Sequence, residues 1–193
     1  DLKYEGDFVD GLKQGYGIDY FANGKKAYEG QFYKHKAHGK GTCYTDDGKK
    51  YVGEWQNGVR NGYGIIYNAK GEKICEGTFK NGGIDGEATY YYDNGEKYVG
   101  TLRNGFRHGK GTLYNPKGEI IYKGEFYLGR IEGTGTYYYE NGCKYEGQLK
   151  DGKRDGIGIL YNPDGTKFCQ GMFKDNNIDG KVTLNYPDGS RYE

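Results

Sequence analysis

Polar and apolar residues alternate along the chain in runs of about five to seven, and most runs end at a glycine-containing turn signal. The runs are rich in Tyr, Phe, Thr, Ile and Val, residue types that favour strands, and D-G, N-G and K-G pairs separate them. No window keeps the i, i+3, i+4 apolar spacing of a helix. The pattern therefore predicts an all-β chain of strands joined by short connections.

The stretch 51–71 shows the predicted unit most clearly. Residues 51–56 are predicted to form one strand, 57–61 a loop and 62–67 a second strand, after which 68–71 reverse the chain. Because every connection of this kind is short, consecutive strands should pair antiparallel and follow one another as a plain meander.

The same unit recurs along the whole chain. Its first position falls at Tyr4, Tyr28, Tyr51, Cys75, Tyr98, Tyr122, Tyr145 and Cys169, and a ninth copy begins at Tyr192. A fixed period of this size indicates an array of supersecondary units. The sequence predicts one domain over residues 1–193: a single elongated, twisted antiparallel β-meander of about eight tandem β-hairpins, solenoid-like, with about sixteen strands.

The step between copies alternates between 24 and 23 residues, so the building block is a pair of copies. A register slip of one residue would turn every side chain of the next strand to the other face. The extra residue of the longer step should therefore be absorbed in a bulge or longer loop, near Ala27, Ile74, Ile121 and Phe168.

Glycines recur at fixed places in each copy, as Y-x-G near its start and G-x-G in its second half. We expect the aromatic rings to cover this bare backbone, because a single-layer sheet has no second layer to bury them. Ala88 and Val182 replace the second glycine of G-x-G and are expected to disturb the ring packing locally. Cys75 and Cys169 replace the opening tyrosine and should be small buried apolar residues.

Written as a pattern, the unit is Y-x-G-x-[FWL]-x-x-G-x-x-x-G-x-G-x-x-Y-x-x-[DNK]-G, and it resembles the MORN repeat (membrane occupation and recognition nexus) over residues 4 to 193. The resemblance is carried by the Tyr51/Gly53 pair, the second aromatic Trp55 and the Gly62/Gly64 pair, and by their equivalents in the other copies. Leu102 and Leu149 depart from the pattern at the second aromatic position. The resemblance implies a protein-interaction platform, of a kind often found beside a catalytic domain or in cytoskeletal and membrane-junction assemblies.

The charge and the candidate reactive residues argue against several classes of function. The net charge of +1 lacks the basic excess of a nucleic-acid-binding protein. The His-Gly-Lys-Gly-Thr segments at 38–42 and 108–112 lack the Ser or Thr and the following helix of a phosphate loop. The four cysteines form no C-x-x-C, and the three histidines have no repeated partners.

We expect no catalysis, no cofactor, no metal and free thiols, in a cytoplasmic protein that is cytoskeleton- or membrane-associated in some settings. The chain begins within a repeat, and we expect it to be part of a longer protein.

Two rows of side chains are the candidate partner-binding residues. The first is an aromatic face on which a peptide or helical segment of a partner protein would lie: Tyr28, Phe32, Tyr51, Trp55, Phe79, Tyr98, Tyr122, Phe126 and Tyr145. The second, the ladder, lies nine residues after each start, in predicted loops, and alternates basic and apolar residues: Lys13, Ala37, Arg60, Ile84, Arg107, Ile131, Arg154 and Ile178. The basic members are expected to be exposed and to grip an acidic partner at intervals.

The function stays open among several classes at this point. A non-catalytic protein-binding scaffold is the first hypothesis. The family name suggests a second, a module that associates with phosphoinositides or an anionic membrane surface, although the net charge of +1 argues against it. A third is a regulatory arm of an enzyme, as in lipid kinases and lysine methyltransferases that carry such repeats. The turn at 138–142 is also similar to a bacterial repeat with Y-Y-x-N-G turns. Open sheet edges predict self-association in addition.

Overall fold

The computed structural model describes residues 3–186 and 188–192, and within them every regular element is a strand. The chain falls into two compact units, Asp1–Tyr92 and Asp93–Glu193. Unit 1 contains β1 (Tyr4–Val9), β2 (Leu12–Tyr20), β3 (Lys26–Tyr33), β4 (Lys36–Tyr44), β5 (Lys50–Gln56), β6 (Val59–Tyr67), β7 (Lys73–Lys80) and β8 (Gly83–Tyr91). Unit 2 contains β9 (Lys97–Arg103), β10 (Phe106–Tyr114), β11 (Ile120–Tyr127), β12 (Arg130–Tyr138), β13 (Lys144–Lys150), β14 (Lys153–Tyr161), β15 (Lys167–Lys174), β16 (Asn177–Asn185) and β17 (Arg191–Tyr192).

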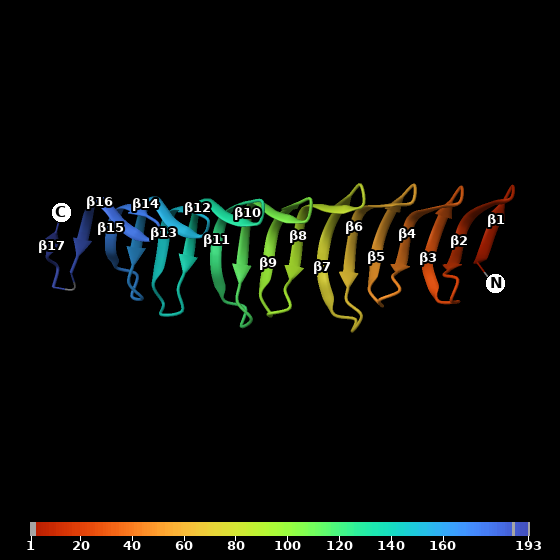
Figure 1. Ribbon diagram of the computed structural model, residues 1–193, viewed down its shortest axis with the longest axis horizontal. Coiled ribbons are helices and arrows are strands. Elements are labelled where there is room, and N and C mark those ends of the chain that lie inside the picture. Colours follow the sequence, from red (N-terminus) through yellow and green to blue (C-terminus); the bar gives the residue numbers. More distant parts are fainter. Residues whose placement is uncertain (1–2, 187, 193) are drawn as a thin grey trace. The chain divides into compact units, whose positions relative to one another are not determined.

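Each strand pairs antiparallel with the next along the chain, from β1 to β8 in unit 1 and from β9 to β17 in unit 2 (Figure 1). The predicted all-β antiparallel meander of tandem hairpins is therefore confirmed within each unit. The short strand β17 contains Tyr192, at which the ninth copy was predicted to begin.

The hairpin connections are shorter than predicted. In the third copy β6 already begins at Val59, so the predicted loop 57–61 is wrong and only Asn57 and Gly58 join the two strands. Both have positive φ, 53° and 86°, as a type I′ turn requires. All eight hairpins of this kind have positive φ at both turn positions: 10–11, 34–35, 57–58, 81–82, 104–105, 128–129, 151–152 and 175–176. The Asn-Gly and Asp-Gly pairs at most of these positions adopt this conformation at little cost.

The bulges that absorb the extra residue lie where the spacing predicted them. Between β2 and β3, Tyr28 pairs with Asp19 and Lys26 with Tyr20, which leaves Ala27 without a register partner. The same shift leaves out Ile74, Ile121 and Phe168 in the later long connections. Because the bulge restores the register, Tyr28 and its equivalents in the other copies keep the same face of the sheet.

A second irregularity of the hairpins was not predicted. After Gly53 the register of β5 and β6 shifts, and the backbone N–H of Tyr63 donates to the Oε2 of Glu54 at 3.3 Å. The equivalent acceptor, three residues after each repeat start, recurs as Asp7, Gln31, Glu125 and Gln148. A side chain therefore satisfies a backbone N–H that the shift removes from the ladder of backbone hydrogen bonds.

In each repeat that opens with tyrosine, the core contains that tyrosine ring lying on glycine backbone. Tyr51 sits beside the cross-strand pair of Gly53 and Gly64, and a Cβ at either glycine would lie under 3.0 Å from its ring. The hydroxyl of Tyr51 reaches beyond the glycines and donates to the carbonyl oxygen of Glu54 at 3.0 Å. The same bond, at 2.9 to 3.1 Å, holds Tyr4, Tyr28, Tyr98, Tyr122 and Tyr145. The expectation that rings cover bare backbone is confirmed.

The two copies without an opening tyrosine show that ring and glycine are coupled. Cys75 and Cys169 are buried, as expected. Their copies are also those in which Ala88 and Val182 replace glycine, and these residues pair across the strands with Gly77 and Gly171. The expected disturbance of ring packing is therefore wrong, because neither copy has an opening ring for Ala88 or Val182 to displace.

Candidate interaction surfaces

The opening tyrosines and second aromatics contact one another edge to face on one side of the sheet, which we call the inner face. In unit 1 the successive contacts join Tyr4, Phe32, Tyr28, Trp55, Tyr51 and Phe79, with ring centroids 4.9 to 5.3 Å apart and interplanar angles of 76° to 90°. In unit 2 Phe126 contacts both Tyr98 and Tyr122, and Tyr145 contacts Phe173. Such edge-to-face contacts add to the stability gained from burial.

Burial changes the role of the predicted aromatic site. Among the predicted residues Tyr28, Phe32, Tyr51, Phe79, Tyr98, Tyr122, Phe126 and Tyr145, no side chain is more than 7% exposed. The prediction of an exposed aromatic face is therefore wrong for these rings, which form the core. Trp55 is half-buried and donates its Nε1–H to the carbonyl oxygen of Gly41 at 3.2 Å.

The basic residues of the ladder also lie on the inner face, in strands, and cover rings. The Arg60 guanidinium lies 5.2 Å from the centroid of Tyr51 and 6.0 Å from that of Phe79. Arg107 and Arg154 lie 5.1 and 5.3 Å from Phe126 and Phe173, and Lys13 lies 4.5 Å from Tyr4. All four are half-buried, so the expectation of exposed loop charges is corrected. They act as cation–π covers over the aromatic core.

The apolar members of the ladder lie opposite phenylalanines in their hairpins. Ala37, Ile84, Ile131 and Ile178 pair across the hairpin with Phe32, Phe79, Phe126 and Phe173. The basic members pair instead with Phe8, Trp55, Leu102 and Leu149. The alternation therefore follows the two-copy block: one hairpin supplies an aliphatic residue opposite phenylalanine, and the other a long cation that reaches the phenylalanine of the following copy.

Burial also makes the hydroxyl and thiol groups of the core poor nucleophiles and bases. It raises the pKa of Tyr51, Tyr122 and Tyr145 to about 12. Burial likewise raises the pKa of the Cys75 thiol to about 11, and raises that of Cys169. A cysteine reacts through its thiolate, so these thiols are unreactive at neutral pH.

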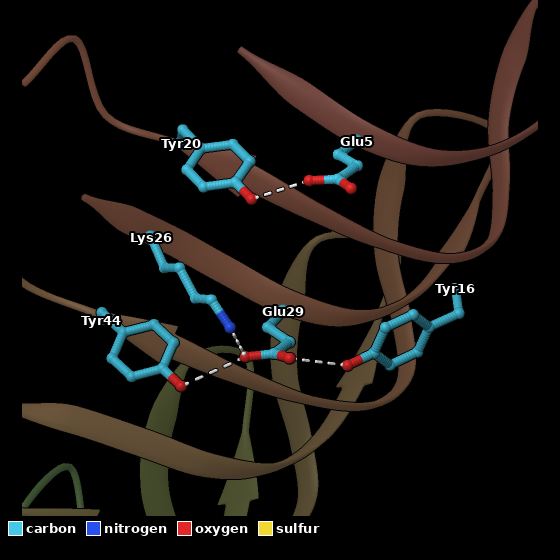
Figure 2. A network of polar contacts seen from close by, with 6 residues as sticks. All are labelled: Glu5, Tyr16, Tyr20, Lys26, Glu29 and Tyr44. Atoms are coloured by element: carbon cyan, nitrogen blue, oxygen red, sulfur yellow. Dashed lines mark hydrogen bonds and ion pairs between the residues drawn. The ribbon is translucent and has the colours of Figure 1, made fainter. Parts of the chain in front are cut away.

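The opposite, outer face carries a polar network that links neighbouring hairpins (Figure 2). Glu29 accepts hydrogen bonds from Tyr16 at 2.8 Å and from Tyr44 at 3.5 Å, and pairs with Lys26 at 2.8 Å. The Lys26 ammonium, followed by the Tyr16 hydroxyl, lowers the pKa of Glu29. Tyr20 donates to Glu5 at 3.0 Å in the same way. The hydrogen bond from Tyr16 to Glu29 thereby joins β2 of the first hairpin to β3 of the second.

A groove of about 500 Å³ crosses the outer face of unit 1, from β2 to β6. Tyr16 and Tyr63, each 54% exposed, stand among its lining residues. The lining is completed by Glu29, Gly30, Lys40, Gly41, Thr42, Val52, Gly53, Glu54 and Ile65. The sequence interpretation missed this groove, although Tyr16 and Tyr63, the middle residues of two G-x-G motifs, pointed to the outer face.

Among the described residues, no group of three or more His, Cys, Asp or Glu side chains is arranged to hold a metal ion. His38 and His108 lie beside Tyr33 and Tyr127, with ring centroids 5.7 and 5.4 Å apart. In the part of the chain that the structure describes, no helix has the length and apolar character needed to cross a bilayer.

Comparison with known families agrees with this geometry. A family model described as MORN repeat matches eight times, at residues 4–26, 28–50, 51–73, 75–97, 98–120, 122–144, 145–167 and 169–191. The single residues between matches are Ala27, Ile74, Ile121 and Phe168, which are the bulge residues of the structure. No curated protein matches the chain.

Proposed function

The chain belongs to the MORN-repeat family, a family of repeat modules, and we propose that it is a non-catalytic protein-binding scaffold. The observation that carries the proposal is the outer-face groove of unit 1, whose lining includes the exposed tyrosines Tyr16 and Tyr63. Tyrosine offers a large contact area with few rotatable bonds, which suits a binding surface.

The length of the groove suits a short extended peptide. Tyr16 and Tyr63 lie on β2 and β6, four strand spacings apart, which is about 19 Å at ~4.8 Å per strand. An extended peptide rises ~3.3 Å per residue, so about six residues would cover this distance. The proposed occupant is an extended segment of a partner protein with a large apolar side chain near each end.

Other features of the chain agree with a binding module. The buried tyrosines and thiols have raised pKa values, which does not suit acid–base or nucleophilic chemistry near pH 7. The four cysteines are free, which favours the cytoplasm with its reducing conditions. A cytoskeletal or membrane-associated setting belongs to the same proposal.

Peptide selection tests the proposal directly. A display library of extended six-residue segments, randomised at every position, would be selected against the purified chain. Selected peptides should lose at least tenfold in affinity for the Tyr16→Ala/Tyr63→Ala variant. Tyr33→Ala is the matched control, because Tyr33 is an exposed tyrosine of unit 1 outside the groove. Peptides that bind all three proteins equally would contradict the proposal.

A membrane surface is the competing outcome. Phosphatidylcholine vesicles with and without a phosphoinositide would be sedimented with the same proteins at low and high salt. Phosphoinositide-dependent co-sedimentation, together with a library that yields no binder, would overturn the protein-binding proposal in favour of lipid association.

A further inference from the structure

One turn of unit 2 departs from all its equivalents. The first residue of each two-residue hairpin turn has a φ of 46° to 53°, and seven of the eight are polar: Asp10, Lys34, Asn57, Asn81, Asn104, Asp151 and Asp175. The eighth is Leu128, with a φ of 46°. Asn and Asp tolerate this left-handed conformation because their short polar side chains bond locally, which leucine cannot do. The turn conformation therefore does not explain Leu128.

Leu128 is also exposed and has large apolar neighbours. Its side chain is 53% exposed, and Tyr127 and Phe106 are 58% and 56% exposed. The Phe106 ring lies beside Gly129, since a Cβ there would be 3.6 Å from the Phe106 Cδ1. Three exposed large side chains are therefore carried by the β11–β12 turn and by the start of β10, which lies beside it. We call Phe106, Tyr127 and Leu128 the turn patch.

The turn patch has a basic rim. In the register of the outer face Phe106 pairs with Arg103, and Tyr127 with Arg130. The Arg103 side chain is exposed, and Arg130 is 69% exposed while it pairs with Asp151 at 2.9 Å. His108 packs against Tyr127. An apolar centre with arginines at its edge is complementary to an apolar segment that carries acidic residues.

The preceding pair of copies serves as a comparison, because it has the same backbone with different residues at these positions. There the equivalents of Phe106, Tyr127 and Leu128 are Val59, Lys80 and Asn81, and Gln56 and Gly83 stand in place of the two arginines. The β-hairpins of both blocks have the same turns and pairings. The turn patch is therefore not required by the fold.

We propose that the turn patch binds an acidic segment of a partner protein whose large apolar side chains contact Phe106, Tyr127 and Leu128. This site rests on the proposed function only in treating the chain as a protein-binding module. The turn patch shares no residue with the groove of unit 1. Because its rim is basic, it selects a segment with negative charge.

Leu128→Asn is the decisive variant, because asparagine before Gly129 is the residue that this turn favours. The variant should fold at least as well as the wild type, so a loss of binding cannot be attributed to unfolding. Asn81→Asp changes the equivalent turn of unit 1 and is the matched control.

The probe is a peptide library in which every member carries several acidic and two large apolar residues at random positions. A second library replaces each acidic residue with lysine. Binders from the acidic library should lose at least tenfold in affinity for Leu128→Asn and for Arg103→Glu/Arg130→Glu. They should bind Asn81→Asp and Tyr16→Ala/Tyr63→Ala as they bind the wild type.

Three results would overturn the proposal. In the first, the lysine library yields equally strong binders; in the second, acidic binders retain full affinity for Leu128→Asn. The third is self-association that sedimentation detects in the wild type and not in Leu128→Asn, because a second copy of the chain would then occupy the turn patch. Failure of the groove variants to affect their own peptides, with turn-patch binding intact, would contradict only the function proposed for the groove.

Discussion

At the scale of single residues, the tyrosine ring and the glycine beneath it act as one structural element. Tyr98 lies over Gly111, and a Cβ there would be under 3.0 Å from the ring. Where the chain has cysteine in place of the tyrosine, it also has alanine or valine in place of the glycine. Ring and glycine should therefore be energetically coupled, as directly contacting residues are.

A double-mutant cycle measures this coupling. Gly111→Ala alone should lower the free energy of unfolding by about 1–3 kcal/mol, because the new methyl group overpacks against Tyr98. In a Tyr98→Cys background the same change should cost less than about 1 kcal/mol, since the ring is absent as it is beside Ala88. Urea denaturation of the four proteins gives both values. Equal costs in the two backgrounds would show that the Tyr98 ring is not the reason that glycine is needed at position 111.

The basic residues of the ladder give a second prediction for single residues. Arg60→Glu removes a cation that lies over two rings of the core and should destabilise the protein by about 1–2 kcal/mol. Lys70→Glu makes the same charge change at an exposed turn and should cost less than about 0.5 kcal/mol. Thermal or urea denaturation compares them. Identical effects would mean that the guanidinium only contributes net charge.

Acid stability follows from the outer-face carboxylates. Hydrogen bonds from Lys26, Lys73 and Lys144 are the largest causes that lower the pKa of Glu29, Glu76 and Glu146. A lowered folded-state pKa contributes stability that is fully present above the unfolded value of about 4.3, and that is lost as pH falls through the folded value. The melting temperature of the wild type should fall below about pH 5 more steeply than that of the triple Glu→Gln variant. Parallel pH profiles would contradict this assignment.

At the scale of strands and turns, the bulge residue is an insertion that the array tolerates. Deleting Ala27 joins Lys26 directly to Tyr28, as Lys50 is joined to Tyr51 in the short connection. The deletion should keep the fold with a loss of a few kcal/mol at most, because Tyr28 stays on the inner face. Deleting Val52 from the middle of β5 should instead turn Tyr51 or Trp55 to the wrong face and unfold unit 1. Circular dichroism and denaturation distinguish the two. A folded Val52 deletion would show that register is not fixed by the core.

The sequence was informative where geometry follows from spacing. The period identified the hairpins, the alternating step located the bulges, and Cys75 and Cys169 were expected to be buried. It was misleading where one residue type serves two purposes. Tyr51 and Tyr63 are both tyrosines of the third repeat, yet Tyr51 is core and Tyr63 lines the groove. Arg60 read as an exposed charge because its contacts with Tyr51 and Phe79 depend on which face β6 presents. The bulge that Glu54 stabilises recurs in every hairpin, so it leaves no change in the step between copies that would reveal it.

At the scale of the whole molecule, stability should be distributed over neighbouring repeats. The ring of Trp55 contacts Tyr28 and Tyr51, which belong to the second and third copies of unit 1. Trp55→Ala should cost about 3 kcal/mol or more, because it leaves a cavity between the two tyrosine rings. Amide hydrogen exchange should then accelerate in β3 to β7. It should stay at the wild-type rate in β13 to β16 of unit 2, whose ring contacts join Tyr145 to Phe173 and do not include Trp55.

A matched change, Phe173→Ala, should give the reverse result. Exchange should then be faster in β13 to β16 and should stay at the wild-type rate in β3 to β7. If either variant accelerates exchange equally in every strand, the chain unfolds as one cooperative body and the nearest-neighbour account of its stability is wrong.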